Sequence, residues 1–285
     1  MPKNKTIRVA IIVIAACIVA ALLWVSFFKP APTGHEQAGP PDMRYLGLAE
    51  VFGGKPKMEV STKTVEIEDG GVKLTGFLAQ PVKSGKYPGI IMIHEWWGLN
   101  DQIKSMAVIL AGEGYVVLAV DLFDGKVATT IPEAQANIGD NPPEKTIPKM
   151  QAAVKYLRGL TDVNAGKIAS LGWCWGGGES FLIGVNEDVQ ATVIYYGQTS
   201  TDKAVLGEMK QPVIGFFGAQ DTSIPVAKVR EFENILKDQG TSVDIYIYEK
   251  AGHAFANPTN TQAFRKDEAI DAWNKTLDFL KQNLK

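Results

Sequence analysis

The hydrophobic pattern after residue 58 consists of short apolar runs that alternate with stretches of helical periodicity. The runs at 89–93 and 116–120 are continuously apolar, which is typical of strands buried on both faces. We expect strands at 65–67, 72–78, 89–93, 116–120, 167–171, 191–196, 213–217 and 243–248, and helices at 101–111, 147–160, 177–185, 225–237 and 264–283. The sequence Asp69-Gly70-Gly71 between the first two runs predicts a hairpin turn.

This alternation of strand and helix indicates the class of fold. Consecutive parallel strands need crossover connections, so the pattern predicts an α/β fold, with a mostly parallel central sheet and helices on both faces. In such a sheet, functional groups lie at the carboxyl ends of the strands. The segment 123–146 shows no clear period and contains Asn141-Pro142-Pro143, so we interpret it as a cap or lid over a site.

The run at 9–28 differs from the others because it contains no charge, Pro or Gly, and only Ser26 as an ordinary polar side chain. A helix of this length, at ~1.5 Å rise per residue, spans roughly 30 Å, about the thickness of a bilayer core. The run therefore predicts a single transmembrane helix through which the protein contacts the membrane. Three basic residues precede it and one follows it, namely Lys3, Lys5, Arg8 and Lys29. This bias favours a cytoplasmic N-terminus and a domain outside the cell membrane.

Two alternatives to an uncleaved anchor concern the same run. A cleaved secretory signal usually has a shorter apolar core and a small-residue cleavage site, whereas this run ends at Phe27-Phe28-Lys29-Pro30. Residues 14–17 resemble a lipoprotein box, but apolar residues continue after Cys17, where lipoproteins normally turn polar. We divide the chain into a cytoplasmic tail and anchor (1–29), a tether rich in Pro and Gly (30–57) and a folded domain (58–285).

The composition of the 285-residue chain is that of an ordinary globular protein, with 46% hydrophobic and 21% charged residues. These fractions exclude a disordered or collagen-like chain. A formal net charge of -2 provides no basic surface for a phosphate backbone, so we expect no nucleic acid partner. Two cysteines are too few for a disulfide scaffold.

The strand expected at 167–171 leads into Gly172-Trp173-Cys174-Trp175-Gly176, a nucleophile elbow with cysteine in place of the usual serine. A sharp turn from strand to helix requires residues without Cβ two positions on either side of the nucleophile. The following helix would direct its N–H groups and positive dipole end at Cys174, which favours the thiolate. The alternative interpretation is a small buried cysteine at a glycine-rich strand end.

Two further strand ends carry the partners that a cysteine nucleophile needs. Asp221 follows the strand expected at 213–217, and His253 follows the strand expected at 243–248. Nucleophile, acid and histidine thus occur in the chain order of an α/β-hydrolase. We expect His253 to take the proton of Cys174 and later to protonate the leaving group, while Asp221 orients the imidazole. The backbone N–H of Trp175 and another from the loop after 89–93 would bind the oxyanion.

That loop contains His94-Glu95, which resembles the start of a zinc protease motif. The second histidine of such a motif would occupy position 98, which is Gly98. The sequence groups no further His or Cys residues, so we assign no metal and no cofactor. A thioredoxin-like role is also excluded, because Cys174-Trp175-Gly176-Gly177 lacks a second cysteine.

Four motifs resemble the dienelactone hydrolase family of α/β-hydrolases. They are His94-Glu95-Trp96-Trp97-Gly98-Leu99-Asn100, residues 172–178 around Cys174, Gly218-Ala219-Gln220-Asp221 and Ala251-Gly252-His253-Ala254-Phe255. The resemblance covers the chain from about residue 60 to the end. It implies an α/β-hydrolase fold, a Glu95 carboxylate that contacts the resting thiol, and a Trp96 backbone N–H as the second oxyanion donor. The alternative for Glu95 is a strand-end carboxylate paired with a surface base.

The sequence departs from this family where a substrate carboxylate would be bound. Family members that act on dienelactone use arginines, one of them four residues after the histidine, and here that position is Asn257. No arginine lies in 121–146, so we expect no bidentate clamp; Lys126 is the nearest substitute, or else a solvated loop lysine. The aromatic residues Trp97, Trp173 and Phe255, beside Trp96 and Trp175, favour an apolar acyl pocket, with core packing as the alternative.

Together these features predict a membrane-anchored hydrolase, facing the exterior, that cleaves small-molecule esters or lactones through a Cys-His-Asp triad and an acyl-cysteine intermediate. Two alternatives remain open at this point. One keeps the triad and changes the substrate to a thioester or a peptide bond. The other is a non-catalytic α/β-hydrolase-like domain that binds a ligand or partner at the cell surface.

Overall fold

The computed structural model describes residues 48, 51, 52 and 56–285. The predicted membrane span at 9–28, Cys17 and most of the tether at 30–57 lie outside the described residues. Among the residues that are described, no helix has the length and apolar character needed to cross a bilayer.

An eight-stranded sheet forms the centre of the domain, in the order β1-β2-β4-β3-β5-β6-β7-β8. The strands are β1 (Val60–Asp69), β2 (Val72–Pro81), β3 (Tyr87–Ile93), β4 (Val116–Asp121), β5 (Val163–Trp173), β6 (Ala191–Tyr195), β7 (Val213–Gly218) and β8 (Val243–Tyr248). β1 and β2 form an antiparallel hairpin, and β2 pairs antiparallel with β4. All other pairs are parallel, which confirms the predicted, mostly parallel sheet.

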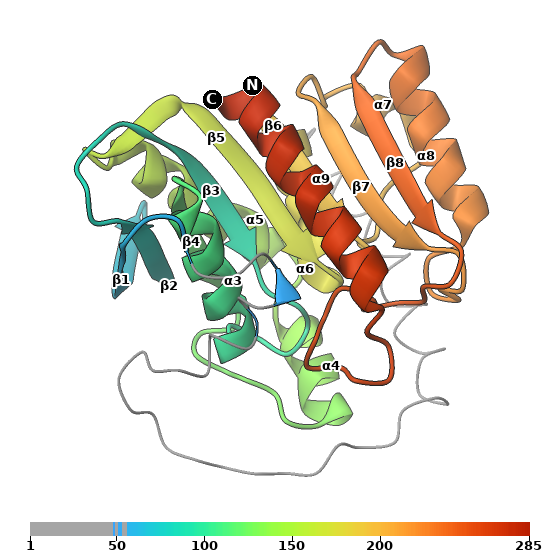
Figure 1. The fold of residues 1–285 in the computed structure, drawn as a ribbon, viewed down its shortest axis with the longest axis horizontal. Coiled ribbons are helices and arrows are strands. Elements are labelled where there is room, and N and C mark those ends of the chain that lie inside the picture. The colour runs from blue at the N-terminus through green and yellow to red at the C-terminus, as the bar shows by residue number, and fades with distance from the viewer. Residues whose placement is uncertain (1–47, 49–50, 53–55) are drawn as a thin grey trace.

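Helices cover both faces of this sheet (Figure 1). They are α3 (Asp101–Gly112), α4 (Ile131–Asp140), α5 (Pro143–Gly159), α6 (Trp175–Asn186), α7 (Lys203–Leu206), α8 (Val226–Asp238) and α9 (Lys266–Leu284). α3 and α9 pack on one face, whereas α5, α6 and α8 pack on the other. Successive side chains of β3 therefore enter opposite cores: Ile91 and Ile93 face α5 and α6, and Ile90 and Met92 face α3. This double burial explains the continuous apolar runs.

The segment 123–146 is more ordered than its sequence pattern suggested. It contains α4 and the first turn of α5, which begins at Pro143 rather than at 147. Thr130 caps α4 through a capping box with Glu133, whose side chain bonds back to the cap backbone. This capping signal was present in the sequence. The helix that follows it is short and has few apolar residues, so it shows no clear helical periodicity.

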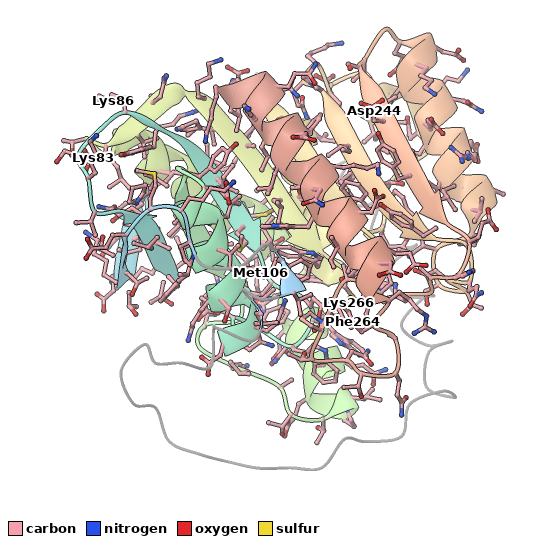
Figure 2. All side chains as sticks on the ribbon, viewed as in Figure 1. Lys83, Lys86, Met106, Asp244, Phe264 and Lys266 are labelled. Carbon is pink, nitrogen blue, oxygen red and sulfur yellow. The ribbon has the colours of Figure 1, made fainter. Side chains whose placement is uncertain are left out.

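The outer surface carries the charged residues that the composition requires. Lys83 and Lys86, in the connection between β2 and β3, are exposed and point away from the domain (Figure 2). Most large apolar side chains of the described residues are buried instead, whereas Val82 and Val127 are about half exposed. In a sheet of this kind, functional groups lie at the carboxyl ends of the parallel strands.

Candidate active site

Cys174 lies in the tight turn between β5 and α6, with φ 55° and ψ −122°. This left-handed backbone is costly for a residue other than glycine, and it raises the side chain above the sheet. A Cβ at Gly172 would collide with the carbonyl oxygen of Gly176, and a Cβ at Gly176 would collide with the carbonyl oxygen of His94. The glycine spacing of the sequence is thus explained by backbone crowding at the elbow.

Three side chains from separate strand ends form one hydrogen-bonded chain. The Nε2 atom of His253 lies 3.0 Å from the Sγ atom of Cys174, and its Nδ1 atom lies 2.7 Å from Oδ2 of Asp221. The other carboxylate oxygen of Asp221 accepts hydrogen bonds from the backbone N–H groups of Ser223 and Ile224, at 2.8 and 3.2 Å. Asp221 is therefore held from both sides, and it orients His253 toward the sulfur.

The charge state of His253 follows from these neighbours. Burial on its own would lower the pKa of this imidazole, but the opposite charges of Cys174 and Asp221, with its hydrogen bonds to both, raise the pKa well above its usual value. A raised pKa favours the imidazolium form of His253. The side chains of Cys174, His253 and Asp221 thus make the contacts that a nucleophile, its base and an orienting acid would need.

Glu95 follows β3 and is buried beside this chain, with 4% of its surface exposed. The amide of Asn257 donates to its Oε2 atom at 2.5 Å, and the hydroxyl of Tyr196 donates to its Oε1 atom at 3.3 Å. Burial raises the pKa of Glu95, while the charge of His253 and the two hydrogen bonds oppose this rise. The predicted contact between Glu95 and the resting thiol of Cys174 stays a prediction.

The sequence reasoning named Asn257 only as the replacement for an arginine and did not identify Tyr196. Tyr196 directly follows β6 with φ 36°, and its ring packs 5.1 Å from the ring of His253. Its position at a strand end was a signal that could have found it. Asn257 could not have been paired with Glu95, because they lie 162 positions apart in the chain.

The proposed oxyanion donors come from two adjoining segments. Trp175 is the first residue of α6, and Trp96 lies in the loop after β3. Gly98 in this loop has φ 92°, and a Cβ there would collide with the carbonyl oxygen of Lys126. The N–H of Ala128 donates to the carbonyl oxygen of Trp97 at 2.9 Å. The loop therefore rests on the segment between β4 and α4, which fixes its position.

The aromatic residues expected in an acyl pocket occupy different environments. Trp173 and Phe255 are 3% and 0% exposed and pack in the core around Tyr195 and Tyr196, so neither offers surface to a substrate in this structure. Trp97 is half-buried and packs edge-on against Trp96 at 5.1 Å. Of the three pocket residues, Trp97 is the one that retains accessible surface.

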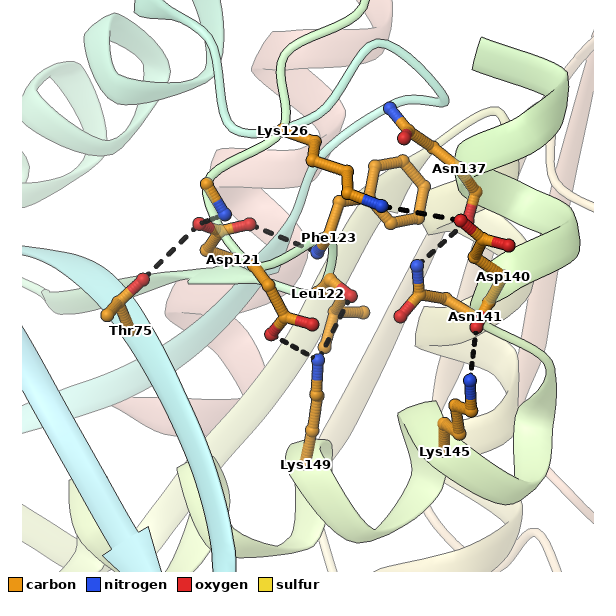
Figure 3. Close-up of polar contacts among 12 residues, drawn as sticks. Thr75, Asp121, Leu122, Phe123, Lys126, Asn137, Asp140, Asn141, Lys145 and Lys149 are labelled. Atoms are coloured by element: carbon orange, nitrogen blue, oxygen red, sulfur yellow. Dashed lines mark hydrogen bonds and ion pairs between the residues drawn. The ribbon is translucent and has the colours of Figure 1, made fainter. Parts of the chain in front are cut away.

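Lys126, considered as a cation for a substrate carboxylate, bonds instead to Asp140 of α4 at 3.3 Å (Figure 3). Both side chains are more than half exposed. Its position fits the solvated alternative better than a binding role. Within residues 56–285, no three or more His, Cys, Asp or Glu side chains are grouped as metal ligands would be.

The amino-acid sequence was compared with known families and proteins. The model of the dienelactone hydrolase family matches residues 74–284. Protein usf of Aquifex pyrophilus is 30% identical over 77% of this chain and 98% of its own length. A Methylorubrum extorquens protein named "Putative carboxymethylenebutenolidase" is 28% identical over 76% of this chain and 79% of its own length.

Solved structures show the same fold. A dienelactone hydrolase-like promiscuous phosphotriesterase from metagenomic libraries superposes with a TM-score of 0.74 and 20% identity, over 79% of this chain and 99% of that one. At this identity the likeness concerns the fold alone. The match of the family model, however, extends over most of the chain and includes all four motifs. The chain therefore belongs to the dienelactone hydrolase family and is a hydrolase with the α/β-hydrolase fold.

Proposed function

We propose that this hydrolase cleaves ester or lactone bonds of small molecules through an acyl-cysteine intermediate on Cys174. The observation that carries the proposal is the chain of contacts from Cys174 through His253 to Asp221. The strained elbow, the buried acid and the raised pKa of His253 support it. The name of one relative agrees with this substrate class: a Bradyrhizobium protein, 29% identical over 77% of this chain, is named "Probable 2-oxo-3-(5-oxofuran-2-ylidene)propanoate lactonase".

The chemistry proceeds in two halves. The Cys174 thiolate attacks the carbonyl carbon, and the resulting oxyanion is bound by the backbone N–H groups of Trp96 and Trp175. As the C–O bond breaks, the His253 imidazolium gives its proton to the leaving alkoxide, which in a lactone stays attached to the acyl chain. His253 then takes a proton from water, the hydroxide attacks the thioester, and the carboxylic acid leaves as the thiolate returns.

Iodoacetamide tests the nucleophile in the full-length protein. We expect full inactivation with one carboxamidomethyl group on Cys174, and a Cys174→Ala variant that loses about 10³-fold or more in kcat. Cys17→Ser is the matched control, because it removes the other cysteine of the chain and should keep full activity. Full esterase activity after modification of Cys174 would contradict the proposal.

The substrate is expected to be neutral near the reacting bond. At the position where dienelactone-cleaving members have an arginine, Asn257 supplies an amide that already bonds Glu95 and Thr259. A buried substrate carboxylate would find no guanidinium there and would lie near the carboxylate of Glu95. Without a charge-assisted hydrogen bond, its desolvation is not compensated.

We also propose that residues 9–28 anchor the protein in the cell membrane, with the domain on the outer side. The apolar run and the excess of basic residues before it support this orientation. Protease added to intact cells should degrade the domain. Full protection would reverse the orientation, and a shortened mature chain would show that the run is a cleaved signal.

A further inference from the structure

His94, at the end of β3, contacts the peptide unit that holds a proposed oxyanion donor. Its side chain is fully buried, and its Nδ1 atom lies 2.6 Å from the carbonyl oxygen of Glu95. That carbonyl and the N–H of Trp96 belong to one planar peptide group. Whatever fixes the carbonyl therefore also fixes the direction in which the Trp96 N–H points.

The second ring nitrogen determines which atom carries the proton. The backbone N–H of Leu122 donates to Nε2 of His94 at 3.3 Å, so Nε2 presents a lone pair and Nδ1 carries the hydrogen in the neutral ring. Nδ1 is thus a donor to the Glu95 carbonyl. Burial lowers the pKa of His94 to about 4, although the bond to that carbonyl and the charge of Asp121 oppose it. The ring is neutral at physiological pH.

The carbonyl of Glu95 accepts a second hydrogen bond, from the N–H of Gly98 at 3.1 Å. Rotation of the peptide plane would break both bonds. The imidazole also packs against two aromatic rings that contact each other: it stacks on Trp175 at 5.4 Å and meets Phe123 edge-on at 4.7 Å. Its ring therefore bonds the backbone of its own loop, which carries Trp96, and packs against Trp175, so it contacts both segments that supply the proposed oxyanion donors.

The backbone N–H of Leu122, which donates to Nε2 of His94, is also held in place by its neighbours. Asp121 accepts hydrogen bonds from the N–H groups of Phe123 and Gly125 at 3.0 and 2.6 Å, and Lys149 bonds the carbonyl of Leu122 at 3.4 Å. Figure 3 shows the bond from Lys149 to the Leu122 carbonyl and the bonds that Asp121 accepts beside it. The backbone of Leu122 therefore has little freedom to follow a displaced ring.

We propose that His94 is a positioning residue for the oxyanion hole: through Nδ1 it aims and polarises the peptide group whose Trp96 N–H binds the developing oxyanion. The proposal rests on the proposed function. A peptide whose carbonyl accepts hydrogen bonds donates more strongly through its own N–H. A donor fixed before the reaction needs no reorganisation in the transition state.

The test separates oxyanion binding from thiol reactivity in the full-length enzyme. His94→Phe keeps an aromatic ring packed against Trp175 and Phe123 but removes both hydrogen bonds. We expect kcat for a p-nitrophenyl ester to fall about 10–100-fold, with KM changed less than about threefold. The rate of iodoacetamide alkylation of Cys174 should stay within about twofold, because that displacement develops no oxyanion.

Two further measurements check the assignment. The affinity for a trifluoromethyl ketone, whose adduct with Cys174 carries an oxyanion, should fall by about the same factor as kcat/KM. His94→Gln, whose amide can both donate and accept, should recover part of the lost kcat. His94→Met gives a second variant without a donor if the phenylalanine variant does not fold. Phe232→Leu, on the buried face of α8, is the control for destabilisation away from the site.

The outcomes are distinct. An unchanged kcat in His94→Phe or His94→Met would overturn the proposal, and so would an alkylation rate that falls in parallel with kcat, which would indicate general damage to the site. Full esterase activity of the wild-type enzyme after modification of Cys174 would instead overturn the proposed function.

Discussion

Glu179 lies in the second turn of α6, directly behind the elbow, and is 4% exposed. Its Oε2 atom has no hydrogen-bond partner among the described residues. Burial raises the pKa of this carboxyl to about 8, while the hydroxyl of Thr146 on α5 offsets part of the effect. The side chain is therefore protonated in the folded protein at neutral pH, although it ionises in the unfolded chain.

The pH dependence follows from this difference. Between the ordinary pKa of 4.5 and the folded value of about 8, the unfolded state releases a proton that the folded state keeps. Rising pH thus favours unfolding across this window, by up to about 1.4 kcal/mol per pH unit, and the full window sets an upper bound of about 5 kcal/mol. Above pH 8 both states are ionised, and the contribution becomes constant.

Glu179→Gln keeps the shape of the side chain and removes the ionisation. We expect the free energy of unfolding of the variant, relative to wild type, to increase by about 2–4 kcal/mol from pH 5 to pH 8. Urea unfolding followed by tryptophan fluorescence in non-ionic detergent measures it. A constant offset from packing does not matter, because only the change with pH is compared. Glu66→Gln, at an exposed position of β1, is the control. Parallel pH curves for wild type and Glu179→Gln would refute the reasoning.

Three other predictions concern the site. Asp221→Asn should lower kcat by about 10³- to 10⁴-fold with little change in melting temperature, since a neutral amide cannot stabilise the imidazolium; steady-state kinetics and thermal melts check this. Gly172→Ala should cost more than about 3 kcal/mol in the free energy of unfolding, because its Cβ meets the Gly176 carbonyl, as a urea titration would show. With Asn257 bonded to Glu95, a carboxylate-bearing lactone should have a kcat/KM no higher than that of its methyl ester. A tenfold preference for the free acid would contradict this last expectation.

The sheet and the elbow could be predicted because their sequence signals are local. Strands buried on both faces leave continuous apolar runs, and the turn at Cys174 requires glycines two positions away on each side. Because Cys174, Asp221 and His253 each follow a different predicted strand, the parallel sheet then predicted that they lie at the same edge. Boundaries were less certain: β1 begins at Val60, five positions before the predicted strand, because its outer face is polar.

The remaining features depend on contacts between distant segments. The amide of Asn257 and the carboxylate of Glu95 meet only because β3 and the segment after β8 end at the same edge. Trp173 and Phe255 are aromatic residues of the kind that line apolar pockets. Both are buried instead, because side chains from distant parts of the sequence pack around them. His94 was considered only as a metal ligand, since its bond to Leu122 cannot be inferred from spacing.

The backbone itself holds the site in place, because hydrogen bonding between neighbouring segments continues beyond the strand ends. The N–H donors and the carbonyl acceptors of these bonds are Cys174 to Tyr195, Tyr196 to Phe216, Ala219 to Tyr248 and Gln220 to Ala251, all between 2.7 and 3.0 Å. The first three bonds join a segment that carries one of the site's side chains to the next strand along the sheet, and the fourth joins the Asp221 segment to the loop after β8. The parallel register thus sets the separation of Cys174, Asp221 and His253 before any substrate arrives. Moving one of these segments would break its main-chain hydrogen bonds to the neighbouring segment. These bonds therefore hold Cys174, Asp221 and His253 in their relative positions.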